Sequence, residues 1–129
     1  MKLYCDMDMV LVRQIAREGF DRFPWMDGGK ELWAAIKGLR PILLTQVRGD
    51  RFGKTAEEKL TWIDRELGAG VAVIFTPDSR GKGPFARPGD VLIDDSTDHC
   101  AAWQKNGGTP ILHLAPNVAA TLAALKALQ

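Results

Sequence analysis

The 129-residue sequence predicts an α/β protein in which a parallel β-sheet is covered by helices on both faces. Short apolar or β-branched segments, each bounded by turn or polar residues, alternate with segments whose apolar residues have helical spacing. Strands that alternate with helices require right-handed crossovers, which place helices on both sides of the sheet. We therefore expect a three-layer α/β/α domain.

Five segments are short and apolar enough to form buried strands. They are residues 2–6, 41–45, 71–75, 90–94 and 110–114. The predicted helices are residues 29–39, 55–67, 98–106 and 117–128. Thr55 is a candidate N-cap, because it precedes two glutamates that would lie at the positive end of the helix dipole. The sheet is thus expected to be five-stranded and parallel.

The composition is that of one globular domain, which we assign to residues 1–129. The chain is long enough for one core and too short for two ordinary domains. Hydrophobic residues make up 46% and charged residues 26%, which excludes a disordered tail or a fibre. Cys5 and Cys100 lie in apolar stretches without metal-ligand spacing, so we expect two buried thiols rather than a disulfide.

The charge balance bears on the partners of the protein. Its 17 lysines and arginines nearly cancel its 16 acids, so no general field attracts nucleic acid or an anionic membrane. No apolar run approaches the roughly 20 residues that span a bilayer, and no secretory signal pattern opens the chain. We expect a cytoplasmic protein without a membrane partner, which holds any anionic ligand locally.

Polar residues gather where the predicted strands end. In open parallel sheets, ligands bind beyond the carboxyl ends of the strands. The residues expected there are Asp6, Asp8, Thr45, Asp94 and Asp95, with Lys82 in the loop before the fourth strand. Carboxylates that converge repel one another, which indicates a divalent cation, and oxygen donors alone favour Mg²⁺ over zinc.

Four motifs in order resemble those of the haloacid dehalogenase (HAD) superfamily. Residues 3–10, LYCDMDMV, resemble the first motif, in which an apolar strand leads into Asp-x-Asp. Leu43-Leu44-Thr45 is similar to the second motif, Lys82 to the third and residues 91–95, VLIDD, to the fourth. The resemblance covers most of the chain and implies a Rossmann-like HAD fold with the strand order 5-4-1-2-3.

A narrower resemblance concerns the substrate. Residues 82–95, followed by Trp103, Gly107-Gly108 and His113, look most like small phage and bacterial proteins related to the 5′(3′)-deoxyribonucleotidases. This implies a nucleoside monophosphate as substrate. Met9 departs from the pattern, because many members have glycine at that position. The departure puts the choice of substrate in doubt more than the catalysis.

The HAD resemblance implies a role for each site residue. Asp6 would attack phosphorus and form an aspartyl-phosphate, and Asp8 would serve as acid and then base. Mg²⁺ would be held by the Asp6 carboxylate, the Asp8 backbone carbonyl and Asp94. Thr45 would bind a phosphate oxygen, and Lys82 would supply positive charge to the transferring group.

Several residues have weaker assignments. Asp95 is expected to orient a metal-bound water or Lys82. Arg48, in the charged loop 48–51, could touch the substrate or be solvated. His99 could line the pocket, whereas His113 lies in an apolar strand and is expected in the core.

Lys59 is the alternative to Lys82 for the third motif. It lies inside the predicted helix 55–67, which should pack on the face of the sheet, whereas Lys82 lies near the strand-end crevice. We therefore assign the role to Lys82 and expect loss of Lys59 to be mild.

The sequence leaves no room for a folded cap domain. Only residues 9–44 separate Asp8 from Thr45, and residues 46–81 separate Thr45 from Lys82. What remains is the segment 11–27, which is either a packed helix and loop or a minimal lid. Its aromatic residues include Trp25, which could stack on a base, and its arginines could hold phosphate. We expect a site that is open, or that is completed by a neighbouring subunit of a homo-oligomer.

The sequence therefore predicts a Mg²⁺-dependent phosphomonoester hydrolase acting on a small phosphorylated substrate. A sugar phosphate or a polynucleotide end is an alternative substrate. A non-catalytic phosphate-binding or receiver-like module is a further alternative, but the acceptor aspartate of a receiver ends the third strand. Here that strand ends at Phe75 and Thr76.

Overall fold

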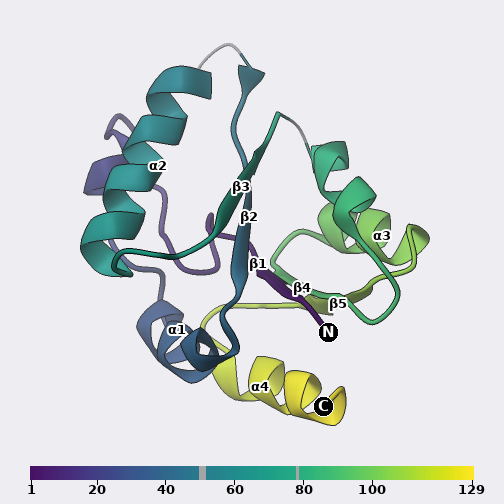
Figure 1. Cartoon of the computed structure of the whole chain (residues 1–129). Helices are drawn as coiled ribbons and strands as arrows, with labels where there is room; N and C mark the ends of the chain where they lie inside the picture. Colours follow the sequence, from purple (N-terminus) through teal and green to yellow (C-terminus); the bar gives the residue numbers. More distant parts are fainter. Residues whose placement is uncertain (50–51, 78) are drawn as a thin grey trace.

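In the part of the chain that the structure describes, the fold is built on a parallel sheet of five strands (Figure 1). The computed structural model describes residues 1–49, 52–77 and 79–129. The strands are β1 (Leu3–Cys5), β2 (Ile42–Gln46), β3 (Val73–Thr76), β4 (Val91–Asp94) and β5 (Thr109–Leu112). Their order across the sheet is β3-β2-β1-β4-β5, and every pairing is parallel. The expected sheet, including its strand order, is confirmed.

The predicted helices are all present, with shifted ends. They are α1 (Gly29–Ile36), α2 (Phe52–Glu66), α3 (Thr97–Lys105) and α4 (Val118–Ala127), with 3₁₀ turns η1 (Phe20–Arg22), η2 (Lys37–Leu39) and η4 (Ser79–Phe85). Helix α2 begins three residues earlier than the sequence suggested, so Thr55 is inside the helix and not its cap. The ring of Phe52 packs against Phe75 of β3, which holds this extra turn on the sheet.

The three layers follow from the alternation of side chains along each strand. Leu3 and Cys5 face the layer of α1, α2 and α4, whereas Tyr4 between them faces the layer of α3 and η4. Leu43 and Leu44 divide between the layers in the same way. Figure 1 shows α2 on one side of the sheet and α3 on the other. Both faces are therefore buried, as a parallel sheet requires.

Two buried tryptophans tie loops to the helices. Trp62 of α2 is fully buried and donates its indole N–H to the carbonyl of Phe23, 2.9 Å away. Trp103 of α3 is also fully buried and donates to the carbonyl of Asp90 at 3.1 Å. Burying an indole is favourable when its N–H finds such a partner. The first contact fastens the 11–27 segment against α2, beside the strand ends.

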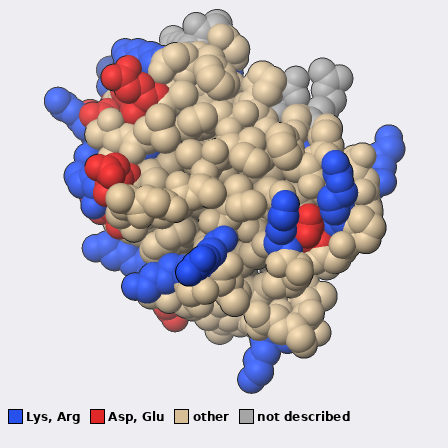
Figure 2. Space-filling view, viewed as in Figure 1, with Lys and Arg blue, Asp and Glu red and all other residues tan. Residues whose placement is uncertain are grey.

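The two cysteines are buried, as the sequence predicted. Cys5 and Cys100 are both free and buried. On the face shown in Figure 2, basic side chains lie at the edge and across the lower part of the face, with acidic ones among them, and they form no single basic patch there. Of the helices in the described part of the chain, none is both long and apolar enough to cross a membrane.

Candidate active site

A tight loop after β1 carries the two aspartates of the first motif. The backbone N–H of Asp6 donates to the carbonyl of Ile93, which fixes it beside β4. Met7 is fully buried, and its carbonyl accepts hydrogen bonds from the next turn of the loop, including Leu11 at 2.9 Å. Met9 has φ +63°, a left-handed conformation that costs a bulky residue free energy and suits glycine. This explains on physical grounds why glycine suits the position.

Lys82 joins the ends of β1 and β4. Its Nζ lies 3.0 Å from Oδ1 of Asp6 and 2.7 Å from Oδ2 of Asp94. The lysine and Asp94 are fully buried, and Asp6 is nearly so. The structure thus brings together Asp6, Asp94 and Lys82, which the sequence predicted to be the nucleophile, a metal ligand and the lysine of one site.

Lys59 forms a second centre beside the first. Its Nζ lies 3.0 Å from Oδ2 of Asp8, 2.6 Å from Oγ1 of Thr45 and 2.9 Å from the carbonyl of Gln46. Only 1% of the residue is exposed. The expectation that Lys59 lies away from the crevice is therefore wrong, since the helix directs its long side chain from the sheet face to the strand ends.

Helical spacing could have revealed Lys59. The buried residues of α2 are Ala56, Lys59, Trp62 and Ile63, which form one stripe at intervals of three and four. A lysine in the apolar stripe of an amphipathic helix indicates a polar or acidic partner nearby, because a charge is not buried without one. Leu60, one position on, lies outside this stripe and is exposed.

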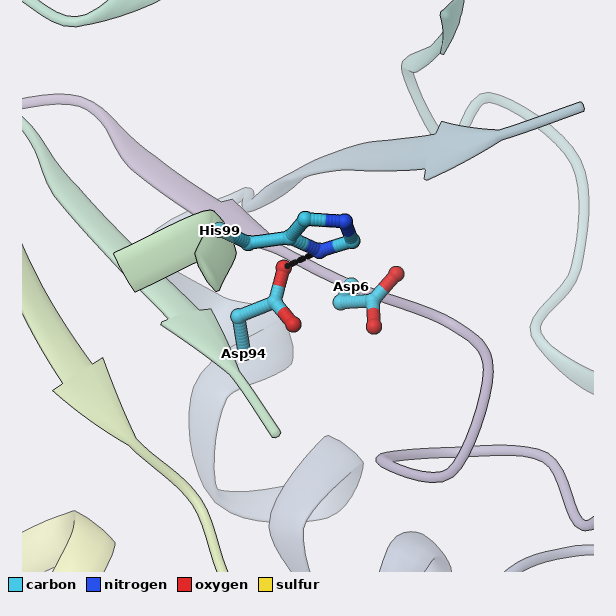
Figure 3. Close-up of side chains that lie close together, drawn as sticks. All are labelled: Asp6, Asp94 and His99. Carbon is cyan, nitrogen blue, oxygen red and sulfur yellow. Dashed lines mark hydrogen bonds and ion pairs between the residues drawn. The ribbon is translucent and has the colours of Figure 1, made fainter. Parts of the chain in front are cut away.

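His99 extends the cluster around Asp94 (Figure 3). Its Nδ1 lies 2.9 Å from Oδ2 of Asp94, and the imidazole is mostly buried. Ser96 caps α3 by accepting a hydrogen bond from the backbone N–H of His99, which fixes the first turn of the helix that carries the imidazole. Ligand atoms of Asp6, Asp94 and His99 all lie within 4.8 Å of one another. His99 therefore lines the site, which its place in the sequence left open.

The pKa values of the carboxyl groups in this cluster are shifted in different directions. Burial raises the pKa of Asp6 well above its usual value, and the charges of Asp94 and Asp8 add to the effect against the opposing charge of Lys82. Burial would also raise the pKa of Asp94, but the hydrogen bond from His99 and the charge of Lys82 lower it overall. Burial raises the pKa of Asp95, although a hydrogen bond with Asp6 opposes this.

Burial and neighbouring charges also shift the pKa values of Lys82 and of the two thiols. Burial alone would lower the pKa of Lys82, yet the charges of Asp6 and Asp94 and its hydrogen bonds to both raise it, so it stays an ammonium. Burial raises the pKa of both thiols, that of Cys100 to about 11. The thiols are therefore protonated and unreactive at neutral pH.

A cavity of about 890 Å³ opens beside Asp8 and Lys59. One wall is the segment 14–20, together with Phe23, and the other is the first two turns of α2 with the loop after β2. Exposed residues of the first wall include Gln14, Ile15 and Arg17. The volume is within the range of small-molecule sites. Arg48 also lines this cavity, whereas Asp50 and Arg51 of the same loop lie outside the described residues.

Trp25 lies elsewhere, so its suggested role as a base-stacking residue needs correction. It packs on Trp62, and its indole N–H donates to Glu66 at 2.8 Å. It lines a smaller hollow with Trp33 and is not among the described residues around the large cavity. Among the described residues, the aromatic side chains that line that cavity are those of Phe20 and Phe23. Of the 11–27 segment, residues 14–20 and Phe23 line the cavity, whereas Leu11 and Val12 are buried in the core.

Comparison with known proteins finds solved structures with a similar fold. No family model and no curated protein matches the sequence. A D,D-heptose 1,7-bisphosphate phosphatase from B. bronchiseptica, complexed with magnesium and phosphate, is similar with a TM-score of 0.61 and 15% identity. The similarity covers 96% of this chain and 87% of that one.

The corresponding enzyme from Burkholderia thailandensis has a TM-score of 0.59 and 18% identity. The match covers 96% of this chain and 85% of that one. The chain shares its fold with these phosphatases. At such identities the likeness establishes the α/β architecture and not the substrate.

Proposed function

We propose that this protein is a Mg²⁺-dependent phosphomonoester hydrolase that acts through an aspartyl-phosphate on Asp6. The observation that carries the proposal is the buried ammonium of Lys82, held between Asp6 and Asp94 at the ends of neighbouring strands. The ordered HAD-like motifs and the phosphatase fold support it independently. The arrangement suits a nucleophile that must accept a dianionic group beside fixed positive charge.

The donor set fits a divalent cation. Asp6, Asp8, Asp94 and Asp95 bring four carboxyl groups to the strand ends, against the two ammonium groups of Lys59 and Lys82. A cation of charge two would balance that difference, and carboxylate oxygens are the donors that Mg²⁺ prefers. Asp6 and Asp94 would hold it by their side chains. The side chain of Asp8 is bound to Lys59, so Asp8 would contribute its backbone carbonyl.

The chemistry divides among residues of the chain. A carboxylate oxygen of Asp6 attacks phosphorus, and the bond to the leaving oxygen breaks as Asp8 gives that oxygen a proton. Water then attacks the aspartyl-phosphate, Asp8 takes the proton of that water, and the Asp6 carboxylate is restored. Lys82 and the hydroxyl of Thr45 stabilise the charge on the phosphoryl oxygens. Bound Mg²⁺ would reduce the repulsion between the anionic nucleophile and the anionic substrate.

The cavity beside Asp8 is the natural place for the leaving group, with the segment 14–20 as a minimal lid. We propose a nucleoside monophosphate as substrate, on the resemblance of the motif region to nucleotidases. A sugar phosphate is the second candidate, because Trp25 is not among the described residues lining the cavity and the fold neighbours are sugar bisphosphate phosphatases. A polynucleotide end and a catalytically silent phosphate-binding module are the further alternatives.

A hydrolysis screen tests the proposal. Nucleoside monophosphates, sugar phosphates, a 3′- or 5′-phosphorylated oligonucleotide and an aryl phosphate would be incubated with the protein, with Mg²⁺ and with EDTA. We expect phosphate release that requires Mg²⁺ and is absent in Asp6→Asn. A purified wild-type protein that binds phosphate and releases none from any substrate would instead support the silent module. Gel filtration with activity assays would show whether a homo-oligomer is the active form.

A further inference from the structure

We propose that Lys59 is a positioning residue, which determines the oxygen of Asp8 that exchanges protons and the direction of the Thr45 hydroxyl. This inference rests on the proposed hydrolase function and deepens it. It gives the site two lysines with different tasks. Lys82 faces the transferring group, and Lys59 orders the residues that act on the leaving group and the phosphate.

The cost of placing Lys59 argues for a role in the site. It occupies the apolar stripe of α2, between Ala56 and Trp62, where a methionine or leucine would fit. A buried ammonium is unfavourable unless it is paired and fully hydrogen-bonded. The ring of Phe20 covers it, with the centroid 4.8 Å from Nζ. The protein thus encloses this charge and directs it towards the strand ends.

The hydrogen-bond geometry accounts for every proton of the ammonium. Lysine has three N–H donors and no acceptor. The three acceptors within reach are Oδ2 of Asp8, Oγ1 of Thr45 and the carbonyl of Gln46. All three hydrogens are therefore used within the protein, so Lys59 has none left for a phosphate oxygen. Its effect on the reaction must pass through the residues that it holds.

The contact with Thr45 fixes the direction of a hydroxyl. Because the ammonium can only donate, Oγ1 of Thr45 accepts its hydrogen bond. The hydrogen of the hydroxyl must then point away from Lys59 and can be donated to a phosphoryl oxygen. Without Lys59 the hydroxyl could rotate and present its lone pairs to the anion instead.

The contact with Asp8 gives its two oxygens different tasks. Oδ2 accepts from Lys59. Oδ1 is buried and, among the described residues, has no hydrogen-bond partner. A buried polar atom without a partner is unfavourable in the resting protein, which points to a partner during turnover. We assign Oδ1 as the oxygen that carries the proton to the leaving group.

Lys82 provides the contrast. Two of its hydrogens are used by Asp6 and Asp94, and the described residues offer no third contact for its ammonium. One donor therefore remains for a phosphoryl oxygen. The two lysines should consequently differ in kinetics as well as in position.

The kinetic test compares Lys59→Met on two substrates that differ in the leaving group. Methionine is apolar, has a high helix propensity and occupies the space of the lysine side chain in the apolar stripe of α2. We expect kcat to fall by about 10- to 100-fold on an alkyl phosphate, as when a residue that orients a catalytic group is lost, with KM changed by less than about 3-fold. On a nitrophenyl phosphate, whose leaving group needs little protonation, the loss should be several times smaller. Lys105→Met, on the exposed end of α3, is the control.

Either of two kinetic results would overturn the proposal. Equal losses on both substrates would assign Lys59 a purely structural role, because a general loss of order does not depend on the leaving group. A raised KM with an unchanged kcat would mean that Lys59 binds substrate directly. Absence of wild-type turnover would instead contradict the proposed hydrolase function. A second measurement then tests the contact between Lys59 and Asp8.

That second measurement is a double-mutant cycle of stability without metal or substrate. Urea unfolding would be followed for Lys59→Met, for Asp8→Asn and for the two combined. If Lys59 holds Asp8, the shift in the urea midpoint of the double variant will differ from the sum of the two single shifts. The double variant will then be more stable than that sum predicts. Additive shifts would overturn the contact on which the proposal depends, whatever the activity.

Discussion

Lys82 and Asp94 form an ion pair 2.7 Å long in which neither side chain reaches solvent. Removing one partner from a buried pair leaves an uncompensated charge. Lys82→Ala should therefore lower the free energy of unfolding by about 3 to 5 kcal/mol. It should also lower kcat by about 100-fold or more, because a preorganised donor to the transferring group is lost. Urea unfolding and steady-state kinetics check the two effects, and a loss of activity below about 3-fold would contradict the assignment.

Asp6→Asn should abolish turnover while it preserves or increases stability. The amide has the volume of the carboxyl group but cannot form an aspartyl-phosphate. Because burial raises the pKa of Asp6, the folded protein binds a proton that the unfolded chain releases as pH rises. That difference destabilises the wild type at neutral pH without metal, and the neutral amide removes it. Thermal unfolding in EDTA would show this, and a lower melting temperature of the variant would contradict it.

Met9 offers a test of backbone strain beside the nucleophile. At φ +63° a residue with a Cβ is disfavoured by roughly 1 kcal/mol relative to glycine. Met9→Gly should therefore be more stable than Met9→Ala by about 1 kcal/mol, although glycine usually destabilises a folded chain. Both variants lose the methionine side chain, so chemical denaturation of the pair isolates the conformational term. Equal stabilities would argue against a left-handed residue at this position.

The sequence was sufficient for the sheet because buried parallel strands appear as short apolar runs. The ends of those runs placed Asp6 and Asp94 at one edge, with Lys82 in the loop before the fourth strand, and the structure brings the three into contact. Lys59 was misjudged because a lysine in a helix is usually solvated, and its partner Asp8 lies 51 residues away. Trp25 was misjudged for a similar reason. Its position among aromatic residues could not show that its N–H meets Glu66, 41 residues on.

His113 should make stability depend on pH. Its Nδ1 lies 2.6 Å from Oγ1 of Thr121, and burial lowers its pKa below the ordinary value of 6.5. As pH falls through the ordinary value, the unfolded chain takes up a proton that the folded protein does not, so stability is lost. One such proton contributes a slope of up to about 1.4 kcal/mol per pH unit.

The comparison for this prediction is His113→Gln, which keeps a polar side chain but does not titrate. Urea unfolding of both proteins at about pH 7.5 and about pH 5.5 separates the histidine from other titrating groups. The wild type should lose more stability than the variant between the two values. A larger loss in the variant would mean that His113 is protonated in the folded protein.

The wall of the cavity provides the last prediction, which separates residues that contact the leaving group from residues that pack. Arg17 is exposed, lines the cavity and lies on the segment proposed as a lid. Arg17→Ala should reduce kcat/KM more for a substrate with a large or anionic leaving group than for a small aryl phosphate, with little change in stability. Trp25 is tied to α2 through Trp62 and Glu66. Trp25→Ala should therefore reduce stability and leave the ratio of kcat/KM between the two substrates unchanged. The ratio of kcat/KM between the two substrates would be measured for both variants at saturating Mg²⁺. A selective effect of Trp25→Ala, or none of Arg17→Ala, would show that the leaving group lies outside this cavity.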